Sequence, residues 1–397
     1  MRKRIFNISH ILIAIFLLLM VKVFTEFTTR LSIFDPIQRA VSNFSILDIF
    51  YQIQDAEEKK VESPFITIVD ISELHERSKI ADVIYAINAC NPAVIGLDVI
   101  FNGLKGDSVG SQYVANAIHE AREPIVAFKL DKKDSIGNFT CTTRSFFSPM
   151  EHVEEGYINM QSVSFGGVIR EMSTWNLLND TTVNSLSYLM ARKYLEYNNI
   201  WQDSKWPKRC LINYTPTEFP IVPYDSVLYR DSLITDRIVL LGTVNDVEDM
   251  HYSPLGRTAG SIIQAYAIQT LIEHHHIKEV TLWLNILITF VLLIITSMAQ
   301  QEISYRAIHS KYIVLRFFFQ TDIINNVMNF VWMLILMGIN YVIVFKYYNI
   351  YFNPTIMLVC IVMLVEVRQS YDLGEKMYKE HKRSKHIKNL KKDKSKI

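Results

Sequence analysis

The stretch VTLWLNILITFVLLIITSMA, residues 280–299, contains no charged side chain. A hydrocarbon core of roughly 30 Å requires about 20 apolar residues of α-helix, so this stretch has the length and composition of a membrane span. Three other stretches have a similar composition, namely residues 8–24, 327–345 and 352–367. The sequence therefore predicts four transmembrane helices, one N-terminal and three C-terminal.

The first of these stretches has a second interpretation, because Arg2, Lys3 and Arg4 precede a short apolar run, ILIAIFLLLMV. A basic start and a short apolar run are also typical of a cleaved signal peptide. The segment that follows, VKVFTEFTTR, lacks the small residues of a cleavage site. We therefore expect a retained membrane anchor.

Lysine and arginine lie mainly in three segments outside the expected helices: the first residues, the loop 300–326 and the tail 368–397. The tail alone holds eleven basic and four acidic residues. Cytoplasmic flanks of membrane helices are enriched in these basic residues, and four helices place the three segments on one side. We therefore predict a multi-pass membrane protein with both termini in the cytoplasm.

Composition excludes some functions. The 397 residues carry a formal net charge of +1, which argues against a basic nucleic-acid-binding surface. The expected spans have no charged residues at their centres, which argues against an ion transporter.

Three of the four cysteines fall between the first and second spans, and this odd count argues against a complete disulfide framework, although one bridge would be compatible with it.

The region between the first two spans alternates between short apolar runs and stretches of helical period. Strands are expected at residues 65–70 (FITIVD), 93–101 (AVIGLDVIF), 124–130, 209–214 and 237–242. Helices are expected at residues 74–90, 113–121, 182–197 and 260–275, whereas residues 131–180 show no clear pattern. This order predicts an α/β domain with a mixed sheet and flanking helices.

Five sequence segments occur in an order that is characteristic of one family. They are ITIVDIS (66–72), GLDVIF (96–101), GGVIR (166–170), LINYTPTEFPIVPYDSVL (211–228) and IVLLGTVNDVEDMHYSPLGRTAGSIIQAYAIQTLI (238–272). Together they resemble the CHASE2 domain, an extracellular sensory module of bacterial membrane receptors. The last segment matches the family pattern at Gly242, Asp249, Pro254, Gly260 and Ala265. It has Gln264 where the family usually has histidine.

The resemblance covers residues 25–279 and extends to the arrangement of one helix before the domain and three after it. It implies a protein of the bacterial inner membrane with an organisation in four parts. These are a cytoplasmic start with the first transmembrane helix (1–26), an extracytoplasmic CHASE2-like sensory domain (27–278), three transmembrane helices (279–367) and a basic cytoplasmic tail (368–397).

CHASE2 receptors usually continue after the last helix into a nucleotide cyclase, a kinase or a related signalling domain. This sequence has about thirty lysine-rich residues there, too few and too polar to bury a core. We therefore expect any signal to pass to a separate effector protein. The last helix of the domain nearly adjoins residues 280–299, so we expect a movement of that helix to carry the signal.

Polar residues follow several of the expected strands, where open α/β sheets bind their ligands. The candidate ligand-binding residues are Asp70, Asp98, Arg170, Thr243, Asp249 and His251. Neighbouring carboxylates could bind a cation or a polyol, with Arg170 as a counter-charge. In the alternative interpretation, Asp70 and Asp98 cap helices and turns, and Arg170 pairs with one of them.

No nucleophile motif is present, so no catalytic residue is assigned and the protein is not expected to be an enzyme. Three adjacent histidines, 274–276, would point about 100° apart on a helix and do not converge on one metal ion. We expect neither a metal site nor a cofactor.

The predicted function is a membrane-anchored sensor of an extracytoplasmic small molecule. An envelope scaffold protein is the alternative, and an extracytoplasmic hydrolase using Asp70, Asp98 and Asp249 is a third hypothesis. The expected partners are the small-molecule ligand, a separate cytoplasmic effector protein, membrane lipids around the spans and basic tail, and a second copy of the chain in a homodimer. Nucleic acid is not among them.

Overall fold

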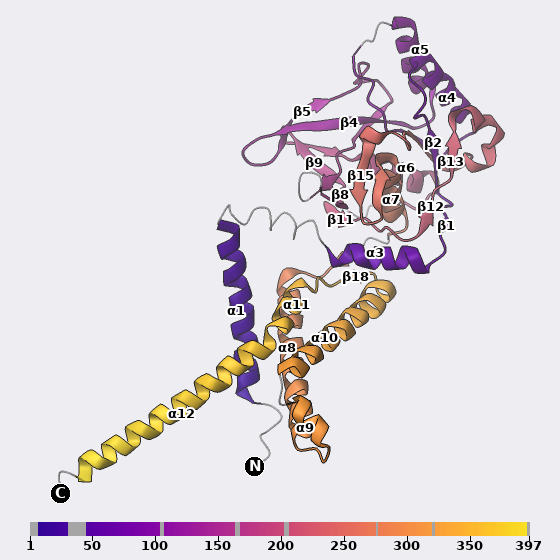
Figure 1. Ribbon diagram of the computed structural model, residues 1–397. Helices are drawn as coiled ribbons and strands as arrows, with labels where there is room; N and C mark the ends of the chain where they lie inside the picture. Colours follow the sequence, from indigo (N-terminus) through magenta and orange to yellow (C-terminus); the bar gives the residue numbers. More distant parts are fainter. Residues whose placement is uncertain are drawn as a thin grey trace. The chain divides into compact units, whose positions relative to one another are not determined.

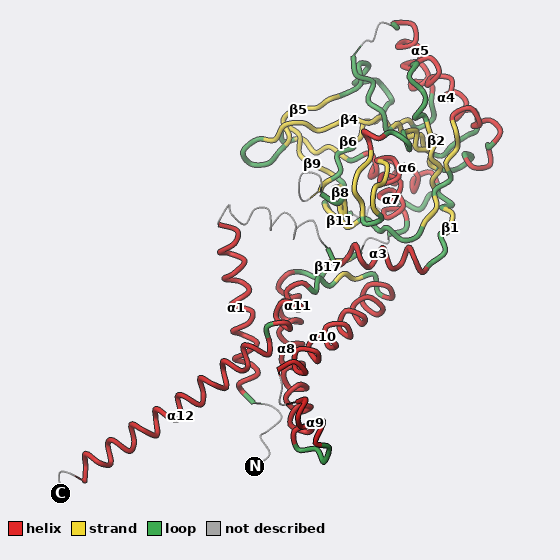
Figure 2. The backbone as a smooth tube through the Cα atoms, viewed as in Figure 1, coloured by secondary structure: helices red, strands yellow, loops and turns green. Residues whose placement is uncertain are grey.

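The computed structural model describes residues 7–30, 45–103, 107–162, 167–201, 206–274, 277–319 and 322–394. The chain divides into two compact units (Figure 1). Residues 39–278 form one unit, here called the central domain, and residues 1–38 with 279–397 form the helical unit. Figure 2 shows that the strands are concentrated in the central domain.

Three helices of the helical unit are long and apolar enough to cross a membrane. They span Ile8–Phe27, Leu282–Ile308 and Ile324–Tyr347, with mean hydropathies of 2.3, 2.3 and 2.0. These helices confirm three of the predicted spans. The helices of the unit are α1 (Ile8–Arg30), α8 (Leu282–Ile308), α9 (Ile313–Phe319), α10 (Asp322–Ile339), the π-helix η5 (Asn340–Tyr347), α11 (Thr355–Val362) and α12 (Leu364–Lys394).

The fourth predicted span, residues 352–367, is not one continuous apolar helix. Its helix α11 ends at Val362, a turn occurs at Met363, and α12 then continues as a largely polar helix to Lys394. Neither helix has the length and composition of a span. Within the described residues, the structure thus shows one such helix near the N-terminus and two in the C-terminal region.

A polar junction joins three helices of this unit. His10 of α1 lies 2.9 Å from the hydroxyl of Ser297 in α8, measured from Nδ1 to Oγ, and both side chains are buried. Arg368 of α12 donates to the Ser297 hydroxyl at 2.7 Å and to the Ser297 carbonyl oxygen at 3.0 Å. Beside these polar contacts, α1, α8, α11 and α12 share an apolar core that includes Leu17, Leu293 and Leu364.

The central domain is built on a sheet whose middle is parallel. Its strands follow the order β10-β9-β5-β4-β3-β14-β2-β13, and β6 also pairs with β4. The parallel strands are β2 (Ile66–Asp70), β3 (Val94–Leu97), the first half of β4 (Pro124–Lys133), β6 (Glu154–Tyr157), β13 (Ile221–Pro223) and β14 (Ile238–Gly242). The second half of β4 pairs antiparallel with β5 (Phe139–Thr143), followed by β9 (Trp175–Leu178) and β10 (Thr181–Asn184).

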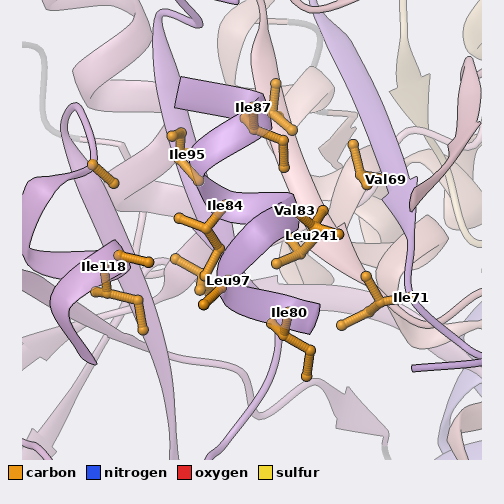
Figure 3. Packing of buried hydrophobic residues seen from close by; sticks show 14 of the residues in the cluster. Val69, Ile71, Ile80, Val83, Ile84, Ile87, Ile95, Leu97, Ile118 and Leu241 are labelled. Atoms are coloured by element: carbon orange, nitrogen blue, oxygen red, sulfur yellow. The ribbon is translucent and has the colours of Figure 1, made fainter. Parts of the chain in front are cut away.

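Helices cover both faces of the parallel strands. Successive side chains of a strand point to opposite faces, so the strands pack against helices on both sides. On one face, α4 (Arg77–Ala89) and α5 (Ser108–Glu120) bury Val69, Leu97 and Leu241 (Figure 3). On the other face lie α6 (Leu186–Tyr197) and α7 (Gly260–Ile272). Gly96 permits this second packing, since a Cβ there would lie 2.2 Å from the Met190 Cε.

The remaining elements surround this core. Helix α3 (Ile46–Glu57) precedes β1 (Val61–Glu62), which pairs with β12 (Thr217–Glu218). A small sheet contains β7 (Gln161–Ser162), β8 (Ile169–Ser173) and β11 (Arg209–Leu211), and a hairpin joins β15 (Met250–Ser253) to β16 (Gly256–Ala259). Among the described residues, the 3-10 helices are η2 (Tyr224–Tyr229), η3 (Asp231–Leu233) and η4 (Val247–Asp249). The remaining short strands are β17 (Lys278–Glu279) and β18 (Ile350–Tyr351).

The α/β organisation with flanking helices is confirmed, with local corrections. Residues 182–184 belong to β10 rather than to a helix, because Ser185 caps α6 by accepting a hydrogen bond from the Tyr188 amide. Helix α3 was not predicted. Helix α7 ends at Ile272, and Ile277 forms a β-bridge with Leu211. The expected near-continuity of the domain's last helix with the second span is therefore wrong.

Candidate functional site

The carboxyl ends of three parallel strands meet at one edge of the sheet. Gly242 of β14 is in register with Asp70 of β2, and Leu241 is in register with Leu97 of β3. Asp98 follows β3 directly, and its amide donates a 2.9 Å hydrogen bond to the Leu241 carbonyl oxygen. Strand pairing thus places Asp98 at the sheet edge where open α/β folds bind ligands.

The Asp98 carboxylate lies beside the N-terminus of α7. The Ser261 hydroxyl donates to its Oδ2 atom at 3.3 Å. Burial, together with repulsion from the Asp249 carboxylate, raises the pKa of Asp98 to about 7, against weaker opposing effects of Ser261 and His251. Such a carboxyl exchanges a proton near neutral pH, a property that occurs preferentially at functional sites.

Asp249 forms the second acidic group and connects several elements. Its Oδ2 accepts from the Thr243 hydroxyl at 3.4 Å, and its Oδ1 lies 3.4 Å from Nε2 of His251. A Cβ at position 260 would lie 2.7 Å from the Asp249 Oδ2, so glycine at the start of α7 allows this carboxylate to approach. The hydrogen bond to Asp249 raises the pKa of His251 above its ordinary value, against the lowering effect of burial.

These residues line a pocket of about 550 Å³. The walls come from the end of β3, from β4 and β8, from the loop after β6, from the β15 hairpin and from the first turns of α7. The lining residues are Asp98, Lys129, Ile158, Asn159, Met160, Gly167, Ile169, Glu248, Asp249, Met250, His251, Tyr252, Gly260 and Gln264. The structure therefore brings Asp98, Asp249 and His251 together in one cavity, and Thr243, which is not among the lining residues, donates a hydrogen bond to Asp249.

Several polar residues of this pocket were not predicted, among them Lys129, Asn159, Glu248 and Gln264. Lys129 interrupts the buried run of β4 with an exposed side chain, and this charge within an apolar strand was a usable signal. Asn159 pairs with the backbone of Leu130, accepting from its amide at 2.7 Å and donating to its carbonyl oxygen at 2.9 Å. Gln264 donates to the Ile158 carbonyl oxygen at 3.3 Å and accepts from Ser187. The two amides therefore fix the loop that forms one wall.

Asp70 stabilises a loop and does not contribute to the pocket. Its carboxylate accepts hydrogen bonds from the amides of Ser72 at 3.0 Å and Val244 at 3.3 Å. It also accepts from Nδ2 of Asn245 at 3.1 Å. These bonds hold the loop that follows β14, and Asp70 is not among the residues that line the pocket. For Asp70, the turn-capping interpretation describes the contacts.

Arg170 is not a counter-charge in this pocket. Its Nε and Nη2 atoms donate to the two carboxylate oxygens of Asp48, at 2.7 and 2.6 Å. Asp48 lies in α3, an element that the sequence analysis did not foresee. The expected pairing of Arg170 with Asp70 or Asp98 is therefore wrong, because a closer carboxylate from a distant segment occupies the guanidinium.

The chemistry available in the pocket is that of charge and hydrogen bonding. In the part of the chain that the structure describes, no group of three His, Cys, Asp or Glu side chains is arranged to hold a metal ion. Apolar side chains of Ile158, Met160 and Ile169 share the cavity with the charged groups. This mixture is typical of sites that bind organic molecules.

The sequence model of the CHASE2 domain matches residues 11–299, which include most of α1, the whole central domain and most of α8. No curated protein and no solved structure matches the chain.

Proposed function

The chain belongs to the CHASE2 domain family, and we propose that its central domain binds a small molecule outside the cytoplasm and signals through the helical unit to a separate effector. CHASE2 is a sensory extracellular domain, and apolar helices at both ends of the chain fit a membrane protein. The observation that carries the proposal is the pocket that contains Asp98, Asp249 and His251.

Several properties of the pocket support ligand binding. Its volume of about 550 Å³ lies within the roughly 300–1,000 Å³ of known small-molecule sites. It opens at the carboxyl ends of parallel strands, which is the usual binding edge of such sheets. Asp98 has a raised pKa and lies next to a second carboxylate, and both features are common where a ligand completes the charge balance.

The proposal includes an orientation in the bacterial inner membrane. Residues 352–367, which comprise α11 and the first turn of α12, would form a fourth crossing, so that both termini face the cytoplasm. Basic residues support this orientation, because eleven of them lie in the tail at residues 368–397. The long helix α12, Leu364–Lys394, would then present these basic residues to an effector or to anionic lipid.

A scaffold function is the second candidate, and one surface favours it. Leu228 and Tyr229 of η2 are 61% and 88% exposed, beside a groove of about 400 Å³ that α4 also lines. Exposed apolar side chains that gather beside a groove are a common feature of protein contact surfaces. Under this alternative, purification in detergent yields a stoichiometric protein partner whether or not small molecules are present.

A ligand screen on the full chain in lipid nanodiscs tests the sensor proposal. We expect at least one compound to raise the unfolding temperature of the wild type and to have a much smaller effect on Asp249→Asn. The control is Glu57→Gln, an exposed position at the end of α3 that should respond as the wild type does. Equal ligand-induced stabilisation of Asp249→Asn and wild type would exclude this pocket as the binding site.

A further inference from the structure

The charges that face the pocket are unequal. Three carboxylates line it, from Asp98, Glu248 and Asp249, whereas Lys129 and His251 supply the basic groups. His251 is already bonded to Asp249, and the side chains of Lys129 and Glu248 are both exposed, which leaves Asp98 and Asp249 as the less exposed charged groups. The interior of the pocket around Asp98 is therefore dominated by negative charge.

The protein's own acids also occupy the positive end of α7. The Asp249 carboxylate lies against Gly260, the first residue of that helix, and Asp98 accepts a hydrogen bond from Ser261, the second. A helix N-terminus attracts anions through its free amides and its dipole. Because Asp249 and Asp98 take these positions, an anionic ligand would meet two carboxylates instead of free donors.

Asp98 itself lacks a strong counter-charge. Among the described residues, the Ser261 hydroxyl, at 3.3 Å, is the one side chain that donates a hydrogen bond to it. Asp249 repels its charged form, and the attraction of His251 offsets only part of this effect. Isolated carboxylates in a buried setting are costly unless a cation pairs with them.

We infer that the pocket recognises a protonated amine, an organic molecule whose ammonium group binds between Asp98 and Asp249 while its carbon skeleton contacts Ile158, Met160 and Ile169. This inference rests on the proposed function, in which the pocket binds a ligand. An ammonium group supplies both the missing positive charge and several N–H donors for the carboxylate oxygens. A cavity of about 550 Å³ with apolar walls suits an organic cation better than a bare metal ion.

Amine binding should release protons. An ammonium group stabilises the charged form of Asp98, so it lowers a pKa that burial and Asp249 had raised to about 7. Affinity should then rise about tenfold between pH 6 and pH 8, since the ionised fraction of such a carboxyl rises by about that factor. The other titratable groups that line the pocket are Lys129, Glu248, Asp249, His251 and Tyr252. Deprotonation of His251 would act in the same direction.

Isothermal titration of the full chain in nanodiscs tests the inference with matched probes. The amines are n-butylamine and 1,4-diaminobutane, their uncharged counterparts are n-butanol and 1,4-butanediol, and butyrate is the anion. We expect an amine to bind at least tenfold more tightly than its hydroxyl counterpart at pH 7.5. Titrations in two buffers of different ionisation enthalpy should show net proton release, a readout that requires no variant.

Two variants assign the released proton. Asp98→Asn should lose most of the proton release and at least tenfold in amine affinity, whereas His251→Gln should retain the release that Asp98 contributes. Circular dichroism establishes that each variant is folded.

Tighter binding of a hydroxyl or carboxylate probe than of its amine counterpart would overturn the amine assignment and leave the proposed function intact. Amine binding without proton release, or with unchanged affinity in folded Asp98→Asn, would also overturn it. The absence of binding by every probe would count against the amine class, and the broader ligand screen then decides separately whether the pocket binds another compound.

Discussion

Arg170 and Asp48 form a two-pronged ion pair, with Nε–Oδ1 and Nη2–Oδ2 distances of 2.7 and 2.6 Å. The pair connects β8 with α3, and the two side chains are 9% and 15% exposed. Parallel hydrogen bonds between a guanidinium and a carboxylate are among the strongest in proteins. Helix α3 is therefore attached to the domain by charge as well as by its buried apolar face.

Removal of one partner should destabilise the central domain. Asp48→Asn leaves the Arg170 guanidinium buried without its carboxylate, and such changes typically cost about 3–5 kcal/mol. We expect a corresponding decrease in the free energy of unfolding, measured by tryptophan fluorescence of the full chain in detergent. The double variant Asp48→Leu with Arg170→Met should recover part of the loss. A single variant as stable as the wild type would show that the pair does not hold α3.

Gly156 should tolerate no side chain. A Cβ on this residue of β6 would lie 2.6 Å from the Cα of Leu186 and 2.7 Å from its nitrogen. Because backbone atoms of α6 cannot rotate away, Gly156→Ala should separate the helix from the strand and cost about 1–3 kcal/mol or more.

Gly96→Ala provides the matched control for Gly156→Ala. Its Cβ would meet the terminal atoms of the flexible Met190 side chain, so its cost should be smaller. Denaturant titration of the two variants measures the difference, and equal stability of both would contradict the backbone contact.

Asp98 should make folding less favourable as the pH rises. Burial and the Asp249 charge raise its pKa to about 7, so the folded state holds the proton more tightly than the unfolded state. Stability should therefore decrease as pH rises from about 4 to above 7. Asp98→Asn should match the wild type near pH 4 and exceed it at pH 8 by a few kcal/mol, since one pKa unit corresponds to about 1.4 kcal/mol.

The raised pKa of His251 gives stability a decrease in the same direction, because its charged pair with Asp249 is lost above that pKa. The difference between wild type and Asp98→Asn across the pH series reports the Asp98 carboxyl together with its electrostatic coupling to Asp249 and His251, since both of these residues are present in the two proteins. Parallel stability curves for the two proteins would contradict the predicted protonation of Asp98.

A native cysteine reports the proposed orientation. Cys141 is exposed, whereas Cys90, Cys210 and Cys360 are buried, and all four are free. A membrane-impermeant maleimide should therefore label intact spheroplasts at Cys141, and Cys141→Ser should abolish the signal. Ser384→Cys in that background places a thiol in the exposed part of α12. It should react only after permeabilisation, and its labelling in intact spheroplasts would contradict a cytoplasmic tail.

The sequence predicted those parts of the fold that depend on continuous local patterns. The parallel strands are short runs of buried apolar residues, as in Val94–Leu97, and their alternation with helices indicated the sheet. Residues 131–180 gave no such signal because their strands are partly exposed, as in Phe139–Thr143. Helix α3 did carry an apolar stripe, including Ile46, Leu47 and Phe50, that periodicity could have revealed.

The pocket was predictable only in part, for a physical reason. Asp70 and Asp98 both follow buried strands, and position alone does not distinguish them. Asp70 accepts hydrogen bonds from the neighbouring Ser72 and from a loop 174 and 175 residues away in the chain, whereas Asp98 meets Ser261 and the Asp249 charge. Arg170 likewise finds a partner 122 residues away. Such choices are decided by tertiary contacts that no local pattern encodes.

The junction of His10, Ser297 and Arg368 restricts how the last helix can move. Arg368 is bonded to both the hydroxyl and the carbonyl oxygen of Ser297, so α12 cannot turn about its axis relative to α8 without losing two hydrogen bonds. Helix α8 is the first span after the central domain in the chain, and α12 carries the basic residues beyond Arg368. A displacement of α8 at Ser297 should therefore also displace the start of α12 at Arg368. Helix α1 should move with them, because His10 is hydrogen-bonded to Ser297.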